Sequence, residues 1–342
     1  MILAADLHLT DNPRDEYRWR VFGEIRAAAA KTGFHRIGLL GDIADRKDRH
    51  SAELVNRFIA ELQANNAAGL ETLMIMGNHD APMRGIPFWD FINSLDCNAI
   101  FMSEPGWIEH GNKRELWLPF TPCPREEWDG IDMAGADVIF MHQPLNGSRV
   151  EHGRQLDFDD KLPPLPKGVP MYAGDIHVHQ IVKGVEYVGA PHPIKFGDDY
   201  NCRLLMLNNN YRIGGEWALS PPVKQNITIS IGDDFSDDMP DFRPGDQVQI
   251  KVEIQASELP MWAEMQERLL AKAQAMGIIV NSIEGVMAQG VSGASKGAGL
   301  AEMQPAEALA AFAQQQALAP AYAEAGAMYL SAAILAGQGV KQ

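Results

Sequence analysis

Cysteine is scarce in this sequence, with three residues among 342. Cys97, Cys123 and Cys202 lie far apart and form no Cys-x-x-Cys pair. The pattern of a disulfide framework is therefore missing, and so is that of a zinc–thiolate site. A reducing compartment suits such a chain, which predicts a cytoplasmic protein.

Long apolar runs are also missing. No stretch has the about 18 consecutive apolar residues that a membrane-spanning helix needs. The opening residues are apolar, but Asp6 interrupts them early and no basic residue precedes them, unlike in a signal peptide. Both observations agree with the expected cytoplasmic location.

Positive charge is in short supply. Lysine and arginine together number 29 against 45 acidic residues, which gives a formal net charge of -16. A protein that binds nucleic acid over an extended surface usually has a basic patch. The acidic balance thus argues against tight non-specific DNA binding by this chain alone. It leaves open chemistry at a metal centre, where bound cations are the largest local charges.

Over roughly the first 220 residues, short apolar runs alternate with helical or polar stretches. This alternation is typical of an α/β domain. Helices are expected at Tyr17–Lys31 and Ser51–Ala64, from apolar spacings of three and four and from Ser51 as an N-cap. Each expected strand runs into a polar cluster; these strands are Met1–Ala5, Ile37–Leu40, Leu73–Met76, Val138–Met141 and Tyr172–Ala173. Because ligands bind at the carboxyl ends of strands in such sheets, we expect the clusters to form one site.

A change of pattern at Pro221-Pro222 predicts a domain boundary. The alternation in Gln247–Ile254 predicts a half-buried strand, followed by a helix for which Ser257 is a candidate cap and by a strand at Ile278–Ile283. We therefore expect a catalytic domain at 1–222, a small α+β capping domain at 223–286, a Gly/Ser-rich linker at 287–300 and a helical tail at 301–342. The tail is either a hairpin that covers part of this chain or a docking element for a partner.

The polar clusters have the composition of a site for divalent metals, which accept mixed carboxylate, imidazole and amide ligands. Two metals about 3.5–4 Å apart need one bridging ligand and several terminal ones. The candidate ligands are Asp6, His8, Asp42, Asn78, His142 and His177. His79 is then free to donate a hydrogen bond to a phosphate oxygen or to protonate a leaving group, oriented by Asp80 or Asp45. A hydroxide shared by the two metals would attack phosphorus in line.

These clusters resemble the motifs of the calcineurin-like metallophosphoesterase superfamily. The matching segments are Asp6-Leu7-His8, Gly41-Asp42-Ile43-Ala44-Asp45, Gly77-Asn78-His79-Asp80, Met141-His142 and Gly174-Asp175-Ile176-His177. The resemblance covers about residues 1–205 and implies a four-layer α/β/β/α sandwich. It also implies that one metal is held by Asp6, His8, Asp42 and His177, that the other is held by Asp42, Asn78 and His142, and that His79 lies near the scissile phosphate.

The last motif departs from the pattern of that family, which usually reads Gly-His-x-His. If Gly174 sets the register, Asp175 replaces the first histidine and binds the second metal; in the other register, His177 and His179 form the pair. The first register is preferred because Gly174 and Gln180 then both fall where the family has them. A carboxylate there would favour Mn²⁺ or Mg²⁺ over softer metals such as Fe²⁺ or Zn²⁺.

A further segment resembles the SbcD-type DNA repair and recombination nucleases, which some phages also encode. It reads Tyr187-Val188-Gly189-Ala190-Pro191 and then Phe196-Gly197-Asp198. In that group the capping domain contacts DNA, the helical tail docks an SMC-like ATPase (SbcC in bacteria), and members are often homodimers. The resemblance therefore implies a Mn²⁺-dependent DNA exonuclease or endonuclease with such a partner. A small-molecule phosphodiesterase or phosphomonoesterase, and a non-catalytic scaffold, are the alternatives.

A basic run follows the second motif directly. Arg46 and Arg49 belong to it, and Arg84 follows the third motif in a similar way. All three are candidate contacts for a phosphate backbone near the metals. A solvated start of the next helix explains the basic run equally simply.

Overall fold

Apolar residues alternate between two separate cores along the strands that precede the polar clusters. In β1 (Ile2–Ala4), Ile2 and Ala4 pack into the core beneath the helices, whereas Leu3 and the following Ala5 pack into a second core. All four side chains are fully buried. A strand that is buried on both faces reads as a continuous apolar run, which is why β1 stands out in the sequence.

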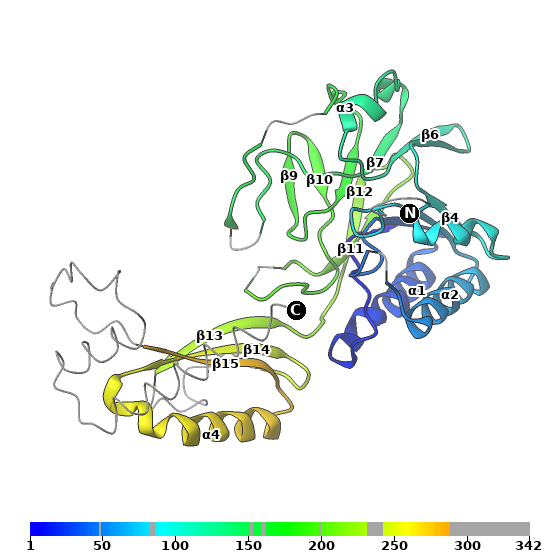
Figure 1. Cartoon of the computed structure of the whole chain (residues 1–342). Coiled ribbons are helices and arrows are strands. Elements are labelled where there is room, and N and C mark those ends of the chain that lie inside the picture. The colour runs from blue at the N-terminus through cyan, green and yellow to red at the C-terminus, as the bar shows by residue number, and fades with distance from the viewer. Residues whose placement is uncertain are drawn as a thin grey trace. The chain divides into compact units, whose positions relative to one another are not determined.

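In the computed structural model, these strands belong to two six-stranded sheets (Figure 1). The structure describes residues 1–47, 49–81, 86–150, 153–158, 162–197, 200–230 and 242–287, all within one compact unit, Met1–Met287. The first sheet has the order β12-β11-β1-β2-β3-β4. Its other strands are β2 (Arg36–Leu40), β3 (Glu71–Ile75), β4 (Ala99–Met102), β11 (Arg203–Leu207) and β12 (Ile213–Ala218). β1 to β4 run parallel, so their carboxyl ends meet at one edge.

The second sheet has the order β5-β6-β7-β8-β10-β9, and β6, β7, β8 and β10 run parallel. Its strands are β5 (Gly106–His110), β6 (Lys113–Leu118), β7 (Val138–His142), β8 (Met171–Gly174), β9 (Gln180–Val182) and β10 (Val185–Tyr187). The core between the two sheets includes Leu3, Leu73, Trp117 and Phe140, and the two sheets therefore stack face to face.

Helices cover the outer face of the first sheet. α1 (Arg20–Thr32) and α2 (Ala52–Ala67) contribute Phe22 and Phe58 to the core that also holds Ile2 and Ile37. α2 begins where the sequence predicts, and the Ser51 hydroxyl caps it by accepting the N–H of Leu54 at 3.1 Å. The expected start of α1 at Tyr17 is wrong because residues Pro13–Trp19 form the 3₁₀ helix η1, with Pro13 at its first turn.

The outer face of the second sheet has little helix. It packs against loops, the 3₁₀ helix η3 (Met133–Gly135) and α3 (Pro124–Glu127), which is a single turn. A further short 3₁₀ helix, η2 (Phe88–Ser94), lies in the connection between β3 and β4. The expected mixed α/β sandwich with two large sheets is confirmed, with helices as a minority of its residues.

Residues after Pro222 form a three-stranded parallel sheet with its own core (Figure 1). The strands are β13 (Lys224–Ser230), β14 (Gln247–Ile254) and β15 (Ile279–Met287), and α4 (Trp262–Ala275) packs against them through Met265 and Leu269. Ser257 is not a cap, because it lies inside the 3₁₀ helix η5 (Ala256–Met261), which Gln255 and Glu258 cap. Whether this sheet is a separate capping domain stays a prediction.

Some expectations fall on parts of the chain that lie outside the described residues. These are Arg84, Asp198, the linker beyond Met287 and the helical tail at 301–342. Within the described ranges, none of the helices combines the length and the apolar character that crossing a membrane would require.

Candidate metal centre

The polar clusters at the ends of five strands meet in one place. Three groups of side chains each bring their ligand atoms within 4.8 Å of one another. The groups are Asp6 with His8 and His177, His8 with Asp42 and His79, and Asp6 with Asp42 and His142. Asp6 and Asp42 follow β1 and β2 of the first sheet, whereas His142 ends β7 and His177 follows β8 of the second. The centre is therefore built at the shared carboxyl edge of both sheets, as expected for ligands in α/β sheets.

Backbone geometry aims these side chains. Asp6, His8, Asp42 and Asp175 have φ values of +56°, +43°, +53° and +83°, in the left-handed region that residues other than glycine rarely adopt. Neighbouring chain segments hold this conformation, because Asp6 N donates to Gly41 O at 3.1 Å and His8 N donates to Asp42 O at 2.9 Å. Such a cluster of unusual conformations is typical of functional sites.

Three glycines leave room for the ligands. A Cβ on Gly41 would lie 2.2 Å from His142 Nδ1, and one on Gly77 would lie 2.2 Å from both N and Oδ1 of Asp42. A Cβ on Gly174 would lie 2.1 Å from Leu40 O and 2.8 Å from His142 Nδ1. Any side chain at these positions would displace the imidazole or the carboxylate, which explains the glycine in each motif.

His142 is oriented by a main-chain carbonyl. Its Nδ1 lies 2.6 Å from Leu40 O, and since a carbonyl only accepts, Nδ1 carries the proton. Nε2 is then a free lone pair for a metal, and it lies 3.4 Å from Asn78 Oδ1, 3.5 Å from Asp42 Oδ1 and 3.7 Å from Asp175 Oδ1. A backbone acceptor behind a ligating histidine is the usual way in which proteins fix its tautomer.

A second set of donors surrounds His8. Its Nε2 lies 3.1 Å from His177 Nε2 and 3.4 Å from Asp42 Oδ2. Asp42 thus offers one oxygen to the His8 side and the other to the His142 side. The structure therefore places Asp42 between the two sets of donors, where a bridging ligand would have to be.

Charge is unbalanced in this cluster. Burial, with some repulsion from Asp42, raises the pKa of Asp6 well above its usual range. Burial likewise raises the pKa of Asp42, Asp80 and Asp175 to about 6. The same desolvation lowers the pKa of His8 to about 3 and lowers that of His142. His8 and His142 are therefore neutral and do not balance the charge of the carboxylates.

Divalent cations fit this donor set. Buried carboxylates are costly unless they are paired or coordinate a metal, and neutral imidazoles are the form that binds metals. In addition, Asp6 Oδ2 is buried and has no hydrogen-bond partner among the described residues. Seven residues would hold the ions: Asp6, His8, Asp42, Asn78, His142, Asp175 and His177.

Asp175 and His179 are the two alternatives for the second metal in the last motif, and they lie in different surroundings. Asp175 Oδ1 lies 3.7 Å from His142 Nε2, and Asp175 N donates to Asp6 Oδ1 at 2.9 Å. His179 Nε2, in contrast, lies 2.6 Å from Glu186 Oε1 on β10. Asp175 is thus within the cluster, whereas His179 is directed to a carboxylate outside it.

His79 lies at the wall of the centre, held on two sides. Its main-chain N donates to Asp42 Oδ1 at 2.8 Å, and its Nδ1 lies 2.5 Å from the carbonyl oxygen of Asp45. Asp45 therefore orients His79 through its backbone, while its carboxylate lies 3.4 Å from His8 Nδ1. The His8 ring lowers the pKa of the Asp45 carboxyl to about 2.

Asp80 has partners other than His79. Its carboxylate accepts the N–H of Ile43 at 3.0 Å and that of Gly77 at 2.9 Å. These bonds tie the loop after β2 to the loop after β3, which carry Asp42 and His79. The geometry makes Asp80 a residue that holds these two loops together.

A cavity of about 160 Å³ opens onto the centre. Its walls include Asp42, Asn78, His79, Asp175 and His177, and also Val150, Ile176, Val178 and Lys195. Lys195 is missed by the sequence analysis because it belongs to no metal motif. Only its position a few residues after the Tyr187–Pro191 segment could have drawn attention to it.

Buried cations lie behind the centre, and sequence reasoning missed them as well. The Arg18 guanidinium donates to the main-chain carbonyl of His8 and lies 3.3 Å from Asp15 Oδ1. Lys224 Nζ of β13 lies 3.2 Å from the same Asp15 oxygen. No local pattern signals these two residues, because their partners come from distant parts of the chain.

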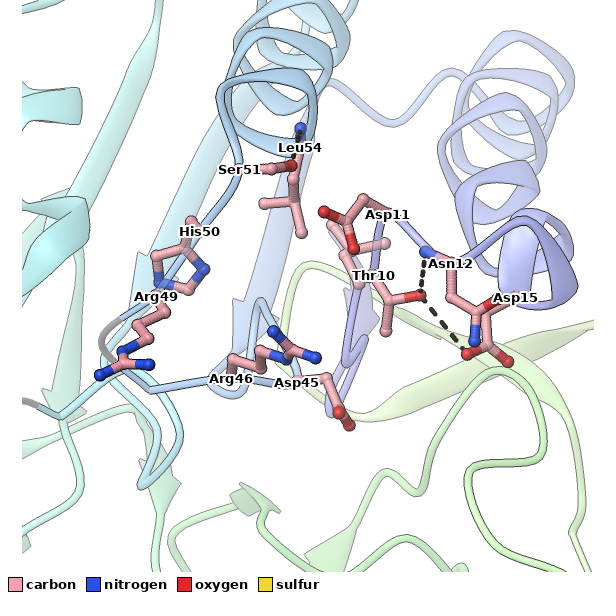
Figure 2. A pocket seen from close by; sticks show the side chains of 11 residues that line it. Thr10, Asp11, Asn12, Asp15, Asp45, Arg46, Arg49, His50, Ser51 and Leu54 are labelled. Carbon is pink, nitrogen blue, oxygen red and sulfur yellow. Dashed lines mark hydrogen bonds between the residues drawn. The ribbon is translucent and has the colours of Figure 1, made fainter.

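A larger cavity, of about 340 Å³, includes Asp45 in its wall, and Asp45 in turn contacts His8 and His79. Figure 2 shows Asp45 and Arg46 on the loop after β2, opposite Thr10, Asp11 and Asn12, with Ser51 at the start of α2. Both arginines of the described basic run, Arg46 and Arg49, line this cavity and are exposed. The structure thus places these two candidate phosphate contacts in the wall of the larger cavity. The third candidate, Arg84, lies outside the described residues.

Comparisons with known proteins agree with this geometry. A family model for calcineurin-like phosphoesterases matches residues 2–178, just over half of the chain. A search of curated proteins gave no match.

The chain also aligns with solved structures at low sequence identity and low TM-score, among them the following three. YfcE, a phosphoesterase from E. coli, is 15% identical with a TM-score of 0.31, over 64% of this chain and 100% of the other. The nuclease MPE from Pseudomonas putida is 15% identical with a TM-score of 0.29, over 64% and 86%. A protein of unknown function from Aquifex aeolicus is 20% identical with a TM-score of 0.24, over 42% and 80%.

Proposed function

Because the chain belongs to the calcineurin-like phosphoesterases, which hydrolyse phosphoesters with divalent metal ions, we propose that it cleaves phosphodiester bonds in DNA with two Mn²⁺ ions. The observation that carries the choice of substrate is the second cavity. A phosphate group needs only the 160 Å³ at the ligands, whereas the 340 Å³ cavity that Asp45 lines is within the size range of sites for organic ligands. A nucleotide that flanks the scissile phosphate would occupy it, with Arg46 and Arg49 beside its phosphate.

The chain's own residues prepare the reaction in three ways. Divalent cations held by the ligands would polarise the phosphate and supply a nucleophile at neutral pH. Asp42 and the glycines of the motifs fix the spacing between the two sets of donors. His79 keeps one proton on Nδ1 for the Asp45 carbonyl. A proton that it gives to the leaving oxygen must therefore come from Nε2.

The test is degradation of end-labelled linear double-stranded DNA with Mn²⁺, run beside the His79→Ala variant. We expect the wild type to degrade the DNA and the variant to be inactive while its metal content, measured by mass spectrometry, is retained. His79 also lies within ligand distance of His8 and Asp42. Loss of metal from the variant would therefore make His79 a ligand and end its proposed role as an acid.

A small phosphate ester is the second candidate substrate, favoured by the net charge of -16. Comparing rates on DNA and on bis(p-nitrophenyl) phosphate separates the two. Hydrolysis of the small diester without any degradation of DNA would move the substrate to nucleotides or other small esters.

The proposed setting is recombination or repair, in which the chain forms a homodimer and an SMC-like ATPase of the SbcC kind docks on residues 301–342. Support for this comes from the Tyr187–Gly197 segment, which resembles that of SbcD-type nucleases. A chain that ends at Met287 should still hydrolyse the small diester, since Met1–Met287 forms one compact unit. The full chain and the chain that ends at Met287 are then compared for co-purification with the ATPase. If both bind it equally well, docking through residues 301–342 is excluded.

A further inference from the structure

Lys195 differs from the other residues that line the metal-centre cavity. Among the described residues of this lining, it is the one lysine or arginine, and it lies with His79, Asn78 and Asp175 around about 160 Å³. Its side chain is exposed, whereas Asp42 and Asp175 are largely desolvated. The cavity thus brings the exposed residue Lys195 together with candidate metal ligands.

The backbone around Lys195 is anchored on both sides. Lys195 N donates to the Tyr200 hydroxyl at 2.8 Å. The carbonyl of Pro193 accepts the Tyr17 hydroxyl at 2.8 Å, and that of Ile194 lies 3.4 Å from Lys224 Nζ. These bonds leave the Lys195 backbone little freedom, and its side chain therefore has a defined starting point at the cavity wall.

The anchoring also links this loop to the metal ligands and to β13. Ala190 N donates to the carbonyl of His177 at 2.9 Å, so a hydrogen bond joins the beginning of the loop to a candidate metal ligand. Gly197 N donates to Lys224 O at 3.3 Å, and Lys224 Nζ lies 5.7 Å from the centre of the Phe196 ring. Lys224, the first residue of β13, thus touches the loop with both its side chain and its backbone.

We propose that Lys195 is a substrate-binding residue, whose ammonium group contacts a non-bridging oxygen of the phosphodiester held at the metal centre. This rests on the proposed phosphodiesterase function and adds a residue that no metal motif contains. A phosphodiester entering the cavity is an anion that must approach several buried carboxylates. An ammonium group in the wall of this cavity adds a positive charge and N–H donors that no metal ligand supplies.

Substrate binding should depend both on the charge of Lys195 and on the position of its backbone. Lys195→Met removes the charge and keeps an unbranched chain, and we expect kcat/KM for bis(p-nitrophenyl) phosphate to fall roughly 10- to 100-fold, as for one lost charge-assisted contact. Lys195→Arg should retain most of the activity. Tyr200→Phe removes the anchor of the Lys195 N–H and should raise KM more than it lowers kcat.

The closing experiment pairs these kinetics with a measurement that needs no turnover. Binding of inorganic phosphate to the Mn²⁺-loaded protein is followed by calorimetry for the wild type, Lys195→Met and the control Lys167→Met. Lys167 is an exposed lysine that precedes β8, at the end of that strand away from the metal centre. We expect phosphate affinity to fall about 10-fold in Lys195→Met only, and ethylammonium to restore part of the activity of Lys195→Ala.

The outcomes separate the two proposals. If the wild type hydrolyses the diester but Lys195→Met behaves like Lys167→Met in rate and in phosphate binding, the role of Lys195 is refuted and the function stands. If the wild type hydrolyses no phosphodiester yet binds phosphate through Lys195, the residue's role stands and the function does not.

Discussion

Replacing Asp175 by asparagine should make the metal-free protein more stable at neutral pH. Burial raises the pKa of this carboxyl from 3.8 to about 6. At about 1.4 kcal/mol per pKa unit, its ionised form opposes folding by about 3 kcal/mol. Asparagine has nearly the same shape without the charge, so the variant should recover up to that amount.

The sign of the pH dependence follows from the raised pKa. Above about pH 6 the carboxyl is ionised in both states, and the full cost is present. As the pH falls, the folded state takes up its proton first, so the metal-free wild type becomes more stable relative to its unfolded state. Near pH 4 the advantage of Asp175→Asn should shrink to less than about 1 kcal/mol.

Urea denaturation in EDTA at pH 7.5 and at pH 4 measures the difference in the free energy of unfolding between Asp175→Asn and the wild type. A thermal scan at pH 7.5 should show that the Tm of the variant is higher by on the order of 5 °C. With saturating Mn²⁺ the order should reverse, because the wild type binds the metal more tightly and is stabilised by it. The reasoning fails if the variant is less stable than the wild type in EDTA at pH 7.5. It also fails if the difference between them is the same at both pH values.

Three other substitutions test separate parts of the structure. Gly77→Ala places a Cβ 2.2 Å from Asp42 Oδ1, and we expect metal affinity, measured by competition with a chelator, to fall roughly 10- to 100-fold; unchanged affinity would contradict the described packing. Glu115→Ala removes the buried carboxylate that pairs with Arg36, and urea denaturation should show a loss of about 3–5 kcal/mol; a loss below about 1 kcal/mol would mean that the pair adds little. Ser51→Ala removes the cap of α2 and should cost about 1 kcal/mol in the same assay, whereas Ser220→Ala, on an exposed loop residue, should have almost no effect.

The sequence revealed the parts of the fold whose signal is local. β1, β2, β3, β7 and β8 are buried parallel strands that read as apolar runs, and each runs into a polar cluster. β14 alternates clearly because one of its faces packs on α4. The candidate ligands could be identified for the same reason, since they follow these strands directly.

Some of the strands that were not predicted have weak local signals, whereas β6 and β11 contain apolar runs that were passed over. β5 is an edge strand with a mixed burial pattern, and β9 and β10 have three residues each. β12 contains two successive glycines, which strands usually avoid. These strands pair with their sequence neighbours, as β5 does with β6, β9 with β10, and β12 with β11, so the weak local pattern rather than distant pairing hides them.

Tertiary contacts also determine the parts of the site that sequence reasoning left open. The choice between Asp175 and His179 depends on Glu186, which β10 places beside the His179 ring. Arg18 and Lys224 meet at Asp15 although more than 200 residues separate them. Lys195 reaches the cavity through a loop that Tyr17 and Tyr200 anchor.

The left-handed backbone at four candidate ligands constrains how this centre could evolve. Asparagine tolerates that conformation about as well as aspartate does, whereas branched residues such as valine or isoleucine do not. At Asp6, Asp42 and Asp175, which have φ values of +56°, +53° and +83°, a carboxylate can thus change to an amide without disturbing the chain. A lineage that lost the chemistry would retain the shape of the loops, and a few single-base changes back to aspartate could restore the metal centre.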